Sequence, residues 1–206
     1  LEVGFRALSW LWVHHLVGDR LNRNVRKKIL ASLLQHATYL EHNLSVYFSP
    51  NTHLLGEAVS LHALGKLLPA MPRAEAWESI GARVVNDEMT RQVRDDGSHF
   101  EQSAYYHVYA LDFFLFHHLL SGTNDLYRSK LVRMADYLSA IMGEARSLPL
   151  IGDDDGGRLF HPYGPCERFG RATLATCAVA LNERRWTVDE ADLHEQAVWW
   201  LDGPLM

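Results

Sequence analysis

A short segment around Asn51 combines an amide, an imidazole and a carboxylate near the predicted start of a helix. Pro50 disfavours a helical conformation at the residue before it, and Asn51 or Thr52 can cap the helix that follows. His53 and Glu57 are four residues apart and therefore share one face of that helix. An amide and an imidazole at a helix N-terminus favour an anion such as a carboxylate, because the free N–H groups and the helix dipole act together.

Two other interpretations of this segment are open. The His53–Glu57 spacing also fits a structural pair that holds two helices together. A metal site would have only these two ligands, and no HExxH pattern accompanies them. We therefore expect no metal ion here, and no segment of the sequence predicts a cofactor.

A second polar segment, residues 95–109, reads as a turn that opens into a helix. Gln102, Tyr106 and Tyr109 fall on one face of that helix. An aromatic stripe at helical spacing is usually part of a core, and we expect Tyr109 to be buried. Tyr106 differs because Gln102 precedes it by one turn and His107 follows it. Such polar neighbours are typical of a side chain that lines a binding site.

The third segment, residues 153–158, has the sequence Asp-Asp-Asp-Gly-Gly-Arg. Three adjacent carboxylates repel one another and need solvent, Arg158, a cation or backbone donors nearby. The twelve-residue spacing of a calcium-binding EF-hand loop is absent, which argues against calcium. A solvated turn and the rim of a cleft are both compatible with this sequence.

The elements that must position these segments are helices. Apolar residues recur at helical spacing almost everywhere, and no period-two alternation predicts a substantial sheet. The longest irregular stretch is residues 148–165, a length typical of functional or disordered loops. We predict one all-α domain over residues 1–206, built from antiparallel helical hairpins arranged as a ring or layers. The expected helices lie near residues 5–17, 24–47, 52–68, 73–94, 101–121, 124–145, 166–182 and 188–201.

Composition excludes several classes of protein. The chain has 206 residues, of which 48% are hydrophobic and 22% charged. A chain of this length and composition can bury a core without disulfide or metal cross-links. The net charge is −5 and no Lys/Arg stripe occurs, so we expect no nucleic-acid partner. No run reaches the roughly 18 apolar residues of a membrane span. Cys166 and Cys177, if on one helix, lie about 16 Å apart, too far for a disulfide.

The three polar segments together resemble the heparinase II/III family, which contains polysaccharide lyases and related alginate lyases. The resemblance lies in residues 51–58, in residues 95–103 with Tyr106 and His107, and in residues 149–158. It implies the helical half of such a protein, an incomplete α/α toroid. Residues 199–204 resemble the point where the toroid gives way to a C-terminal β-sandwich. We therefore expect a fragment of a longer protein, whose β-sandwich would act as a partner in cis.

The resemblance implies β-elimination at a uronic acid of an acidic polysaccharide. Removing the proton at C5 requires neutralisation of the adjacent carboxylate, a role that the family pattern gives to Asn51 and His53. Tyr106 occupies the position of the Tyr that takes the C5 proton or protonates the leaving oxygen at C4. A Tyr base needs a lowered pKa or nearby cations, which His107, Arg158 or the missing domain could supply. Substrate contacts are expected from Gln102, Glu57, His107, Asp153 and Arg158.

The chain departs from the family pattern at two points. Many relatives have Asn-Asn-His where this chain has Asn51-Thr52-His53, and relatives take a further His or Tyr from the β-sandwich. Two other functions are open: a non-catalytic polysaccharide-binding module, and a glycoside hydrolase. The hydrolase would use Glu57 or Glu101 with Asp153, at a carboxyl separation of about 5–9.5 Å.

We expect Asn51, His53 and Tyr106 to converge on one concave face, with residues 153–158 at its edge. A cleft without its partner domain leaves the substrate solvated, so we expect residues 1–206 alone to turn over polysaccharide poorly. If the parent protein degrades polysaccharide, a periplasmic or secreted location is expected. The sugar and its linkage are not encoded in any motif.

Overall fold

The computed structural model describes residues 1–159 and 166–201, and these are helices joined by loops, with no strand among them. In this part of the chain, the one isolated β contact is an antiparallel bridge between Val93 and His99. None of the described helices is long and apolar enough to cross a membrane. The predicted all-α class is confirmed. The chain forms two compact units, Leu1–Asp87 and Glu88–Met206, and each is described separately below.

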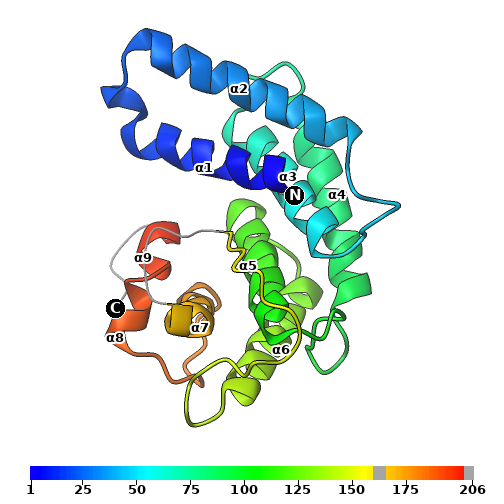
Figure 1. Ribbon diagram of the computed structural model, residues 1–206, viewed down its shortest axis with the longest axis vertical. Helices are drawn as coiled ribbons and strands as arrows, with labels where there is room; N and C mark the ends of the chain where they lie inside the picture. Colours follow the sequence, from blue (N-terminus) through cyan, green and yellow to red (C-terminus); the bar gives the residue numbers. More distant parts are fainter. Residues whose placement is uncertain (160–165, 202–206) are drawn as a thin grey trace. The chain divides into compact units, whose positions relative to one another are not determined.

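The first unit is organised around α3, which is buried along nearly its whole length. α3 is apolar on almost every face, and its residues Leu55, Ala58 and Leu61 are completely buried. Figure 1 shows α1 and α2 as a hairpin, and both helices pack on α3. The helices of this unit are α1 (Glu2–Val17), α2 (Arg23–His42), α3 (Thr52–Leu67) and α4 (Ala74–Gln92), the last reaching into the second unit; a short 3₁₀ turn (Gly18–Arg20) follows α1.

Two glycines allow the backbones of α3 and α4 to touch. A Cβ atom added at Gly81 would lie 2.5 Å from the carbonyl oxygen of Ala58 and 2.6 Å from the backbone nitrogen of His62. One added at Gly65 would lie 2.4 Å from backbone atoms of Ala74 and Glu78. Since backbone cannot move aside as a flexible side chain can, this contact fixes how the two helices pack.

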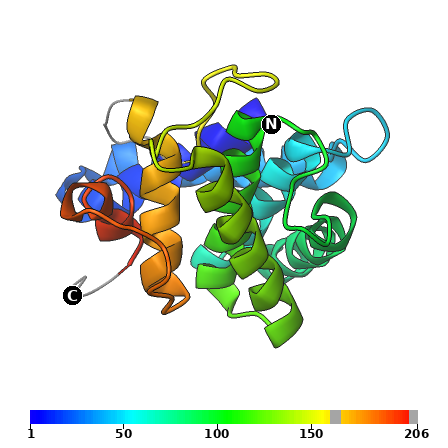
Figure 2. The same cartoon turned by 90° about the horizontal axis from the view of Figure 1, so that it is seen from below.

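The second unit contains three long helices and two very short ones. Figures 1 and 2 show α5, α6 and α7 side by side, with α5 almost completely buried and Phe113, Phe114 and Leu115 in the core. The helices are α5 (Ala104–Ser121), α6 (Asp125–Met142), α7 (Phe169–Ala180), α8 (Glu190–Leu193) and α9 (Ala197–Trp200), with a 3₁₀ turn (Cys166–Arg168) before α7. The single domain predicted for residues 1–206 stays a prediction.

The helix predicted over residues 188–201 is wrong, because the structure has α8 and α9 there with a break between them. Gln196 lies at the break, and its buried side chain donates to Asp112 Oδ1 at 2.9 Å and accepts from Thr176 Oγ1 at 3.0 Å. Asp112 is fully buried, and burial raises its pKa to about 7. The hydrogen-bonding needs of these interior groups therefore override the helical pattern of the sequence.

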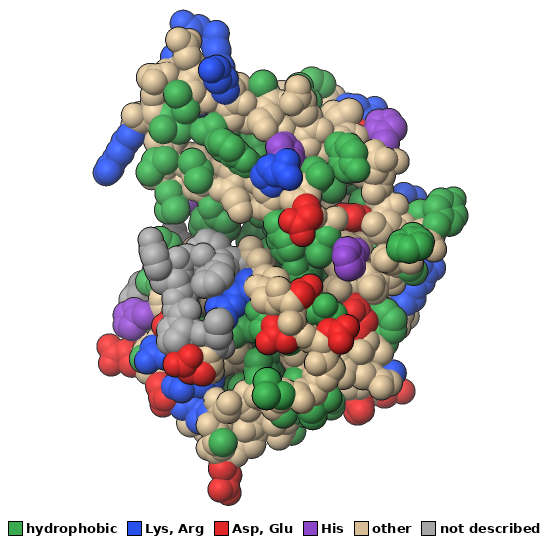
Figure 3. All heavy atoms as spheres, in the orientation of Figure 1, with side chains coloured by type: hydrophobic (Ala, Val, Ile, Leu, Met, Phe, Trp, Pro, Cys, Tyr) green, Lys and Arg blue, Asp and Glu red, His purple; other side chains and the backbone are tan. Residues whose placement is uncertain are grey.

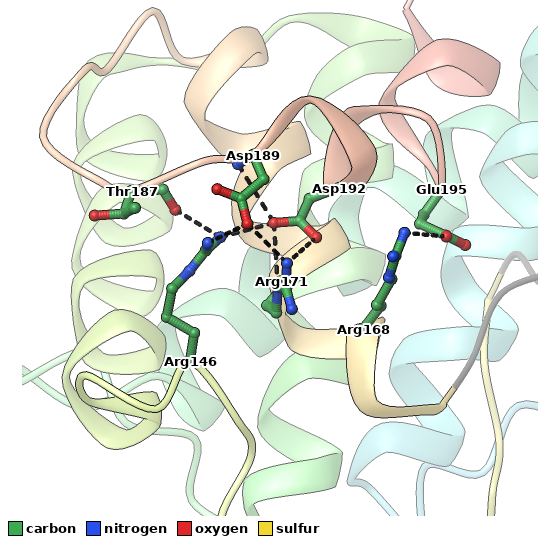
Figure 4. Close-up of polar contacts among 7 residues, drawn as sticks. All are labelled: Arg146, Arg168, Arg171, Thr187, Asp189, Asp192 and Glu195. Atoms are coloured by element: carbon green, nitrogen blue, oxygen red, sulfur yellow. Dashed lines mark hydrogen bonds and ion pairs between the residues drawn. The ribbon is translucent and has the colours of Figure 1, made fainter.

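An arginine–aspartate network fixes the chain before this break (Figure 4). Arg146 contacts Asp189 Oδ2 at 2.5 Å and Asp192 Oδ2 at 2.7 Å. Arg171 of α7 contacts the same two carboxylates, each at 2.9 Å. The Asp192 side chain is fully buried, so its charge is compensated by two guanidinium groups, as a buried carboxylate requires. The network attaches α8 to α7 and to the loop after α6.

The α3–α4 contact yields a stability prediction. Gly81→Ala places a methyl group within 3 Å of the α3 backbone, so we expect a loss of about 1–3 kcal/mol in the free energy of unfolding. Gly18→Ala is the matched control: its nearest neighbours would be 3.7 Å away and its backbone is right-handed helical. The control should be neutral or stabilising by about 0.4–1 kcal/mol. Chemical denaturation measures both, and an unchanged Gly81→Ala would disprove the close contact.

Candidate functional site

The beginning of α3 carries the first pair of candidate residues. Asn51 is the N-cap, as predicted, and its Oδ1 accepts from the backbone N–H of His53 at 3.0 Å. The same oxygen lies 3.0 Å from Nδ1 of the His53 ring. An amide oxygen only accepts, so Nδ1 carries the proton in this arrangement. Because the ring is exposed, its other nitrogen, Nε2, is accessible to a ligand at a helix N-terminus.

Glu57 is buried, and its carboxylate is bonded to other groups of the first unit. Its Oε2 accepts from the backbone N–H of Ser45 at 2.7 Å, and its Oε1 accepts from the Ser45 hydroxyl at 2.9 Å. These bonds hold the loop between α2 and α3 against α3. They also explain why α2 ends at His42 and not at the predicted residue 47. Ser45 cannot continue the helix while it is bonded to Glu57. Glu57 therefore positions the loop, and we leave it out of the proposed site.

The loop that Glu57 anchors presents two aromatic side chains that the sequence analysis missed. Tyr47 and Phe48 are 97% and 96% exposed. In Figure 3, hydrophobic side chains project at the right-hand edge, where Figure 1 shows this loop. Large apolar side chains so exposed are commonly binding residues. Their signal in the sequence was an aromatic pair directly before the Ser-Pro-Asn turn, of which Tyr47 was the last residue of the helix predicted over residues 24–47.

The start of α5 carries the second set of candidate residues. Gln102 has a left-handed backbone with φ of 59°, so α5 begins at Ala104 rather than at the predicted residue 101. The Ser103 hydroxyl donates to the carbonyl of Asp153 at 2.6 Å, and Ala104 N–H donates to the carbonyl of Ile151 at 2.9 Å. The segment after α6 thus lies across the first turn of α5, at the end of the α5–α7 group visible in Figure 2.

Tyr106 makes the contact most relevant to proton transfer. Its hydroxyl donates to Asp155 Oδ2 at 3.1 Å. Partial burial raises the pKa of Tyr106 to about 12, and the nearby charge and hydrogen bond of Asp155 contribute, with smaller effects of Asp153 and Glu101. A lowered pKa, one of the two conditions named for a Tyr base, is therefore not met in this structure. At neutral pH the phenol is protonated, which suits a proton donor better than a base.

His107 and Arg158 do not act on Tyr106 as the sequence analysis expected. His107 is only 1% exposed, and its Nε2 bonds to a backbone carbonyl of α6 at 2.9 Å. Burial lowers its pKa to about 4, so it is neutral at pH 7. Arg158 lies 4.6 Å from the centre of the Phe169 ring, and its Nε is 3.4 Å from the Tyr105 hydroxyl. We leave His107 out of the proposed substrate contacts.

Backbone donors resolve the repulsion within the acidic segment. Gly156 N–H donates to Asp154 Oδ1 at 3.0 Å, and Gly157 N–H donates to Asp155 Oδ1 at 2.9 Å. The three aspartates are exposed, and Figure 3 shows acidic side chains grouped on one face of the second unit. A pocket of about 270 Å³ adjoins them. It is lined by Tyr105, residues 147–154 and Glu167.

The structure thus brings together two groups of predicted site residues, one in each unit. Asn51 and His53 are in contact at the start of α3, whereas Tyr106, Gln102 and residues 153–158 meet at the start of α5. The convergence of the two groups on one face stays a prediction. Across residues 1–159 and 166–201, no cluster of three or more His, Cys, Asp or Glu side chains could hold a metal ion.

The Tyr106–Asp155 contact yields a titration prediction. In Asp155→Asn the pKa of Tyr106 should fall from about 12 toward its ordinary value of 10, but stay above 10 because the burial remains. NMR detection of the tyrosine ring carbon as the pH is raised measures this pKa. Since the folded-state value is the higher one, the stability due to this group is complete below pH 10 and disappears toward pH 12.

Asp154→Asn is the matched control for this titration. Asp154 is adjacent in sequence and equally exposed, but its carboxylate bonds to the Gly156 backbone rather than to the phenol. The Tyr106 titration should not change in this variant. Equal behaviour of the two variants would show that Asp155 has no specific effect on the phenol.

A family model described as Heparinase II/III N-terminus matches residues 1–155 of the chain. The chain is 33% identical over 82 residues to a heparin-sulfate lyase from Bacteroides stercoris, a match that covers 40% of this chain and 12% of the relative. It is 36% identical over 88 residues to a heparin-sulfate lyase from Pedobacter heparinus, covering 43% of this chain and 13% of the relative. The matches therefore span a small part of these relatives.

Solved structures with a similar fold are also of a heparinase and a heparan sulfate lyase. A crystal structure of heparinase III has a TM-score of 0.61 and 22% identity, over 68% of this chain and 22% of that one. A heparan sulfate lyase, HepC from Pedobacter heparinus, has a TM-score of 0.56 and 24% identity, over 79% of this chain and 27% of that one. Heparinase III is an α/α toroid protein, so these similarities confirm the predicted fold class.

Proposed function

The chain belongs to the heparinase II/III N-terminus family, and from this membership we propose that it supplies catalytic residues of a polysaccharide lyase. The substrate class is a uronic-acid-containing polysaccharide of the heparan sulfate kind, the class on which the matched lyases act. The observation that carries the proposal is the Tyr106 phenol. It is partly exposed, it is protonated at neutral pH, and Asp155 orients it.

The first chemical requirement is neutralisation of the uronate carboxylate. β-Elimination removes the proton at C5, and negative charge then develops on the adjacent carboxylate. The Asn51–His53 pair lies at the N-terminus of α3, where the helix dipole favours an anion. Because Nδ1–H is directed at Asn51, the accessible Nε2 is the ring atom that would contact the carboxylate. It donates a hydrogen bond when the ring is protonated.

The second requirement is a proton for the leaving oxygen. As the C5 proton departs, the C4–C5 double bond forms and the C4–O bond breaks, so the departing oxygen needs a proton. Tyr106 supplies it, because a phenol with a raised pKa holds its proton until the leaving oxygen becomes basic. Asp155 keeps the hydroxyl oriented until that point. The C5 base is then the further His or Tyr that relatives contribute from their β-sandwich.

Substrate binding adds a role for the exposed aromatic pair. Tyr47 and Phe48 precede Asn51 by only three or four residues, and the Ser45–Glu57 bonds hold their loop in place. Aromatic rings pack well against the apolar C–H faces of sugar rings, and anchoring reduces the entropy lost on binding. We assign these side chains to the substrate-binding surface of the proposed site.

A non-catalytic polysaccharide-binding module is the second candidate. Thr52, which stands where many relatives have a second Asn, is 2% exposed and cannot present a side chain to a ligand. A site with one amide, where many relatives have two, is compatible with a protein that binds the polysaccharide but does not cleave it. The hydrolase alternative that pairs Glu57 with Asp153 has no comparable support, since the Glu57 carboxylate is bonded to Ser45.

The experiment that tests the proposal is digestion of heparan sulfate by the full-length protein, followed by ultraviolet absorbance. A lyase creates an unsaturated uronate that absorbs, whereas a hydrolase or a binding module does not. Tyr106→Phe should lower kcat about 10²–10⁴-fold and leave substrate binding nearly intact, because the hydroxyl acts in the transition state. Tyr39→Phe, on an exposed face of α2, is the control and should keep full activity.

His53→Ala should behave differently in the same assay. Contact with the carboxylate begins in the ground state and strengthens in the transition state, so KM should rise and kcat should fall together. Full activity of Tyr106→Phe would refute its role as the acid. Binding of heparan sulfate without any absorbing product would favour the non-catalytic module instead.

The aromatic pair generates a separate prediction. Tyr47→Ala combined with Phe48→Ala should weaken binding of heparan sulfate oligosaccharides, or raise KM, by about tenfold or more, with kcat little changed. The fold should tolerate this change because both side chains are exposed. Isothermal titration calorimetry measures the affinity, with Leu126→Ala, another exposed apolar residue, as the control. Unaltered affinity would remove the pair from the proposed site.

A further inference from the structure

Two buried histidines border a small cavity beside the first turn of α5. His99 is 2% exposed and His107 is 1% exposed. Both line a cavity of about 30 Å³, which Gln102, Ser103 and Ala104 also border. The Nδ1 atom of each ring is buried and has no hydrogen-bond partner among the described residues. Buried polar atoms in native proteins nearly always have partners, so this pair requires one.

The tautomer of His99 follows from a chain of hydrogen bonds. Gln92 Nε2 donates to Glu88 Oε2 at 2.8 Å, which fixes the orientation of the amide because a carboxylate only accepts. Gln92 Oε1 therefore faces His99 Nε2, at 2.8 Å, and can only accept from it. The proton of the neutral ring is on Nε2. Its Nδ1 is consequently an acceptor, buried without a partner among the described residues, in a ring that lines the cavity.

His107 has the same tautomer for an independent reason. Its Nε2 lies 2.9 Å from the backbone carbonyl oxygen of Met134, which is an acceptor, so Nε2 again carries the proton. Burial lowers the pKa of His99 to about 3 and of His107 to about 4, which keeps both rings neutral at pH 7. Each of the two rings that line the cavity therefore has its N–H bonded elsewhere and an acceptor, Nδ1, without a partner among the described residues.

Two acceptors cannot bond to each other, so the ligand must offer two donors or be a cation. A buried cation would need a compensating anion, and the residues that line the cavity include no carboxylate or thiolate. A water molecule has two O–H donors, and the cavity of about 30 Å³ exceeds the roughly 10–15 Å³ that one bound water requires. We propose that one water molecule is bound here and donates to His99 Nδ1 and to His107 Nδ1.

This water site would join two parts of the second unit that are not otherwise linked through these side chains. His99 belongs to the turn after α4, which Gln92 fixes, and His107 belongs to α5. The cavity borders Ser103, the N-cap of α5, so the water would support the turn from which Tyr106 projects. The inference rests on the hydrogen-bond geometry alone and does not depend on the proposed lyase activity.

A crystal structure of the full-length protein that resolves ordered waters is the direct test. We expect one density peak of water strength within hydrogen-bond distance of both Nδ1 atoms. His99→Gln and His107→Gln are suitable variants, because the Gln amide can replace the Nε2 donor while removing the Nδ1 acceptor. Absence of the peak in the wild-type protein would overturn the proposal, and so would an anomalous signal from a metal ion.

A double-mutant cycle provides a solution test. If both histidines share one water, the loss of Tm in the double variant should be clearly smaller than the sum of the two single losses, because the first change already removes one of the water's two partners. His117→Gln is the matched control. His117 is equally buried on α5 but lies about 15 Å further along the helix, so its effect and that of His99→Gln should add. Additive losses for His99 and His107 would contradict the shared ligand.

Discussion

The Ser103 hydroxyl makes two hydrogen bonds on which the arrangement of the second unit's candidate site depends. It accepts from the backbone N–H of Tyr106 at 3.1 Å, which caps α5, and it donates to the carbonyl of Asp153 at 2.6 Å. The same atom therefore starts the helix and holds the acidic segment, which is fifty residues away in sequence. The Tyr106–Asp155 bond then closes a ring of contacts between the two, so the phenol and its acceptor are positioned by one local structure.

Much of the fold was predictable, because helical periodicity and capping residues are local signals. Asn51 and Thr52 were the two predicted caps, from their types and the proline before them, and the structure has Asn51 as the N-cap of α3. The predicted helix boundaries were wrong where a contact with a residue distant in sequence determines the backbone conformation. Ser45 leaves the α2 register to reach Glu57, and Gln196 interrupts a helical pattern to reach Asp112. Neither partner lies within the window that a periodicity argument considers.

The candidate site was predictable in its residues but not in their environments. Spacing placed His53 and Glu57 on the same helix, yet one is exposed and the other buried, because the packing of α3 differs along its length. The pKa of Tyr106 is raised by burial and by Asp155, and no spacing rule connects Asp155 to it. His107 follows Tyr106 directly, and adjacent residues on a helix point in different directions, so proximity in sequence misled the assignment.

The arginine–aspartate network around Asp192 has a consequence for the order in which the protein loses structure. α8 and α9 contain four residues each, far below the length at which a helix persists alone in water. Arg171 attaches α8 to α7, Arg146 attaches it to the loop after α6, and the buried Gln196 before α9 bonds to both α7 and α5. Because these contacts share the same few groups, we expect residues 187–201 to open as one cooperative unit before the α5–α7 core. Amide hydrogens in this segment would then exchange with solvent at a common rate, set by a single opening event.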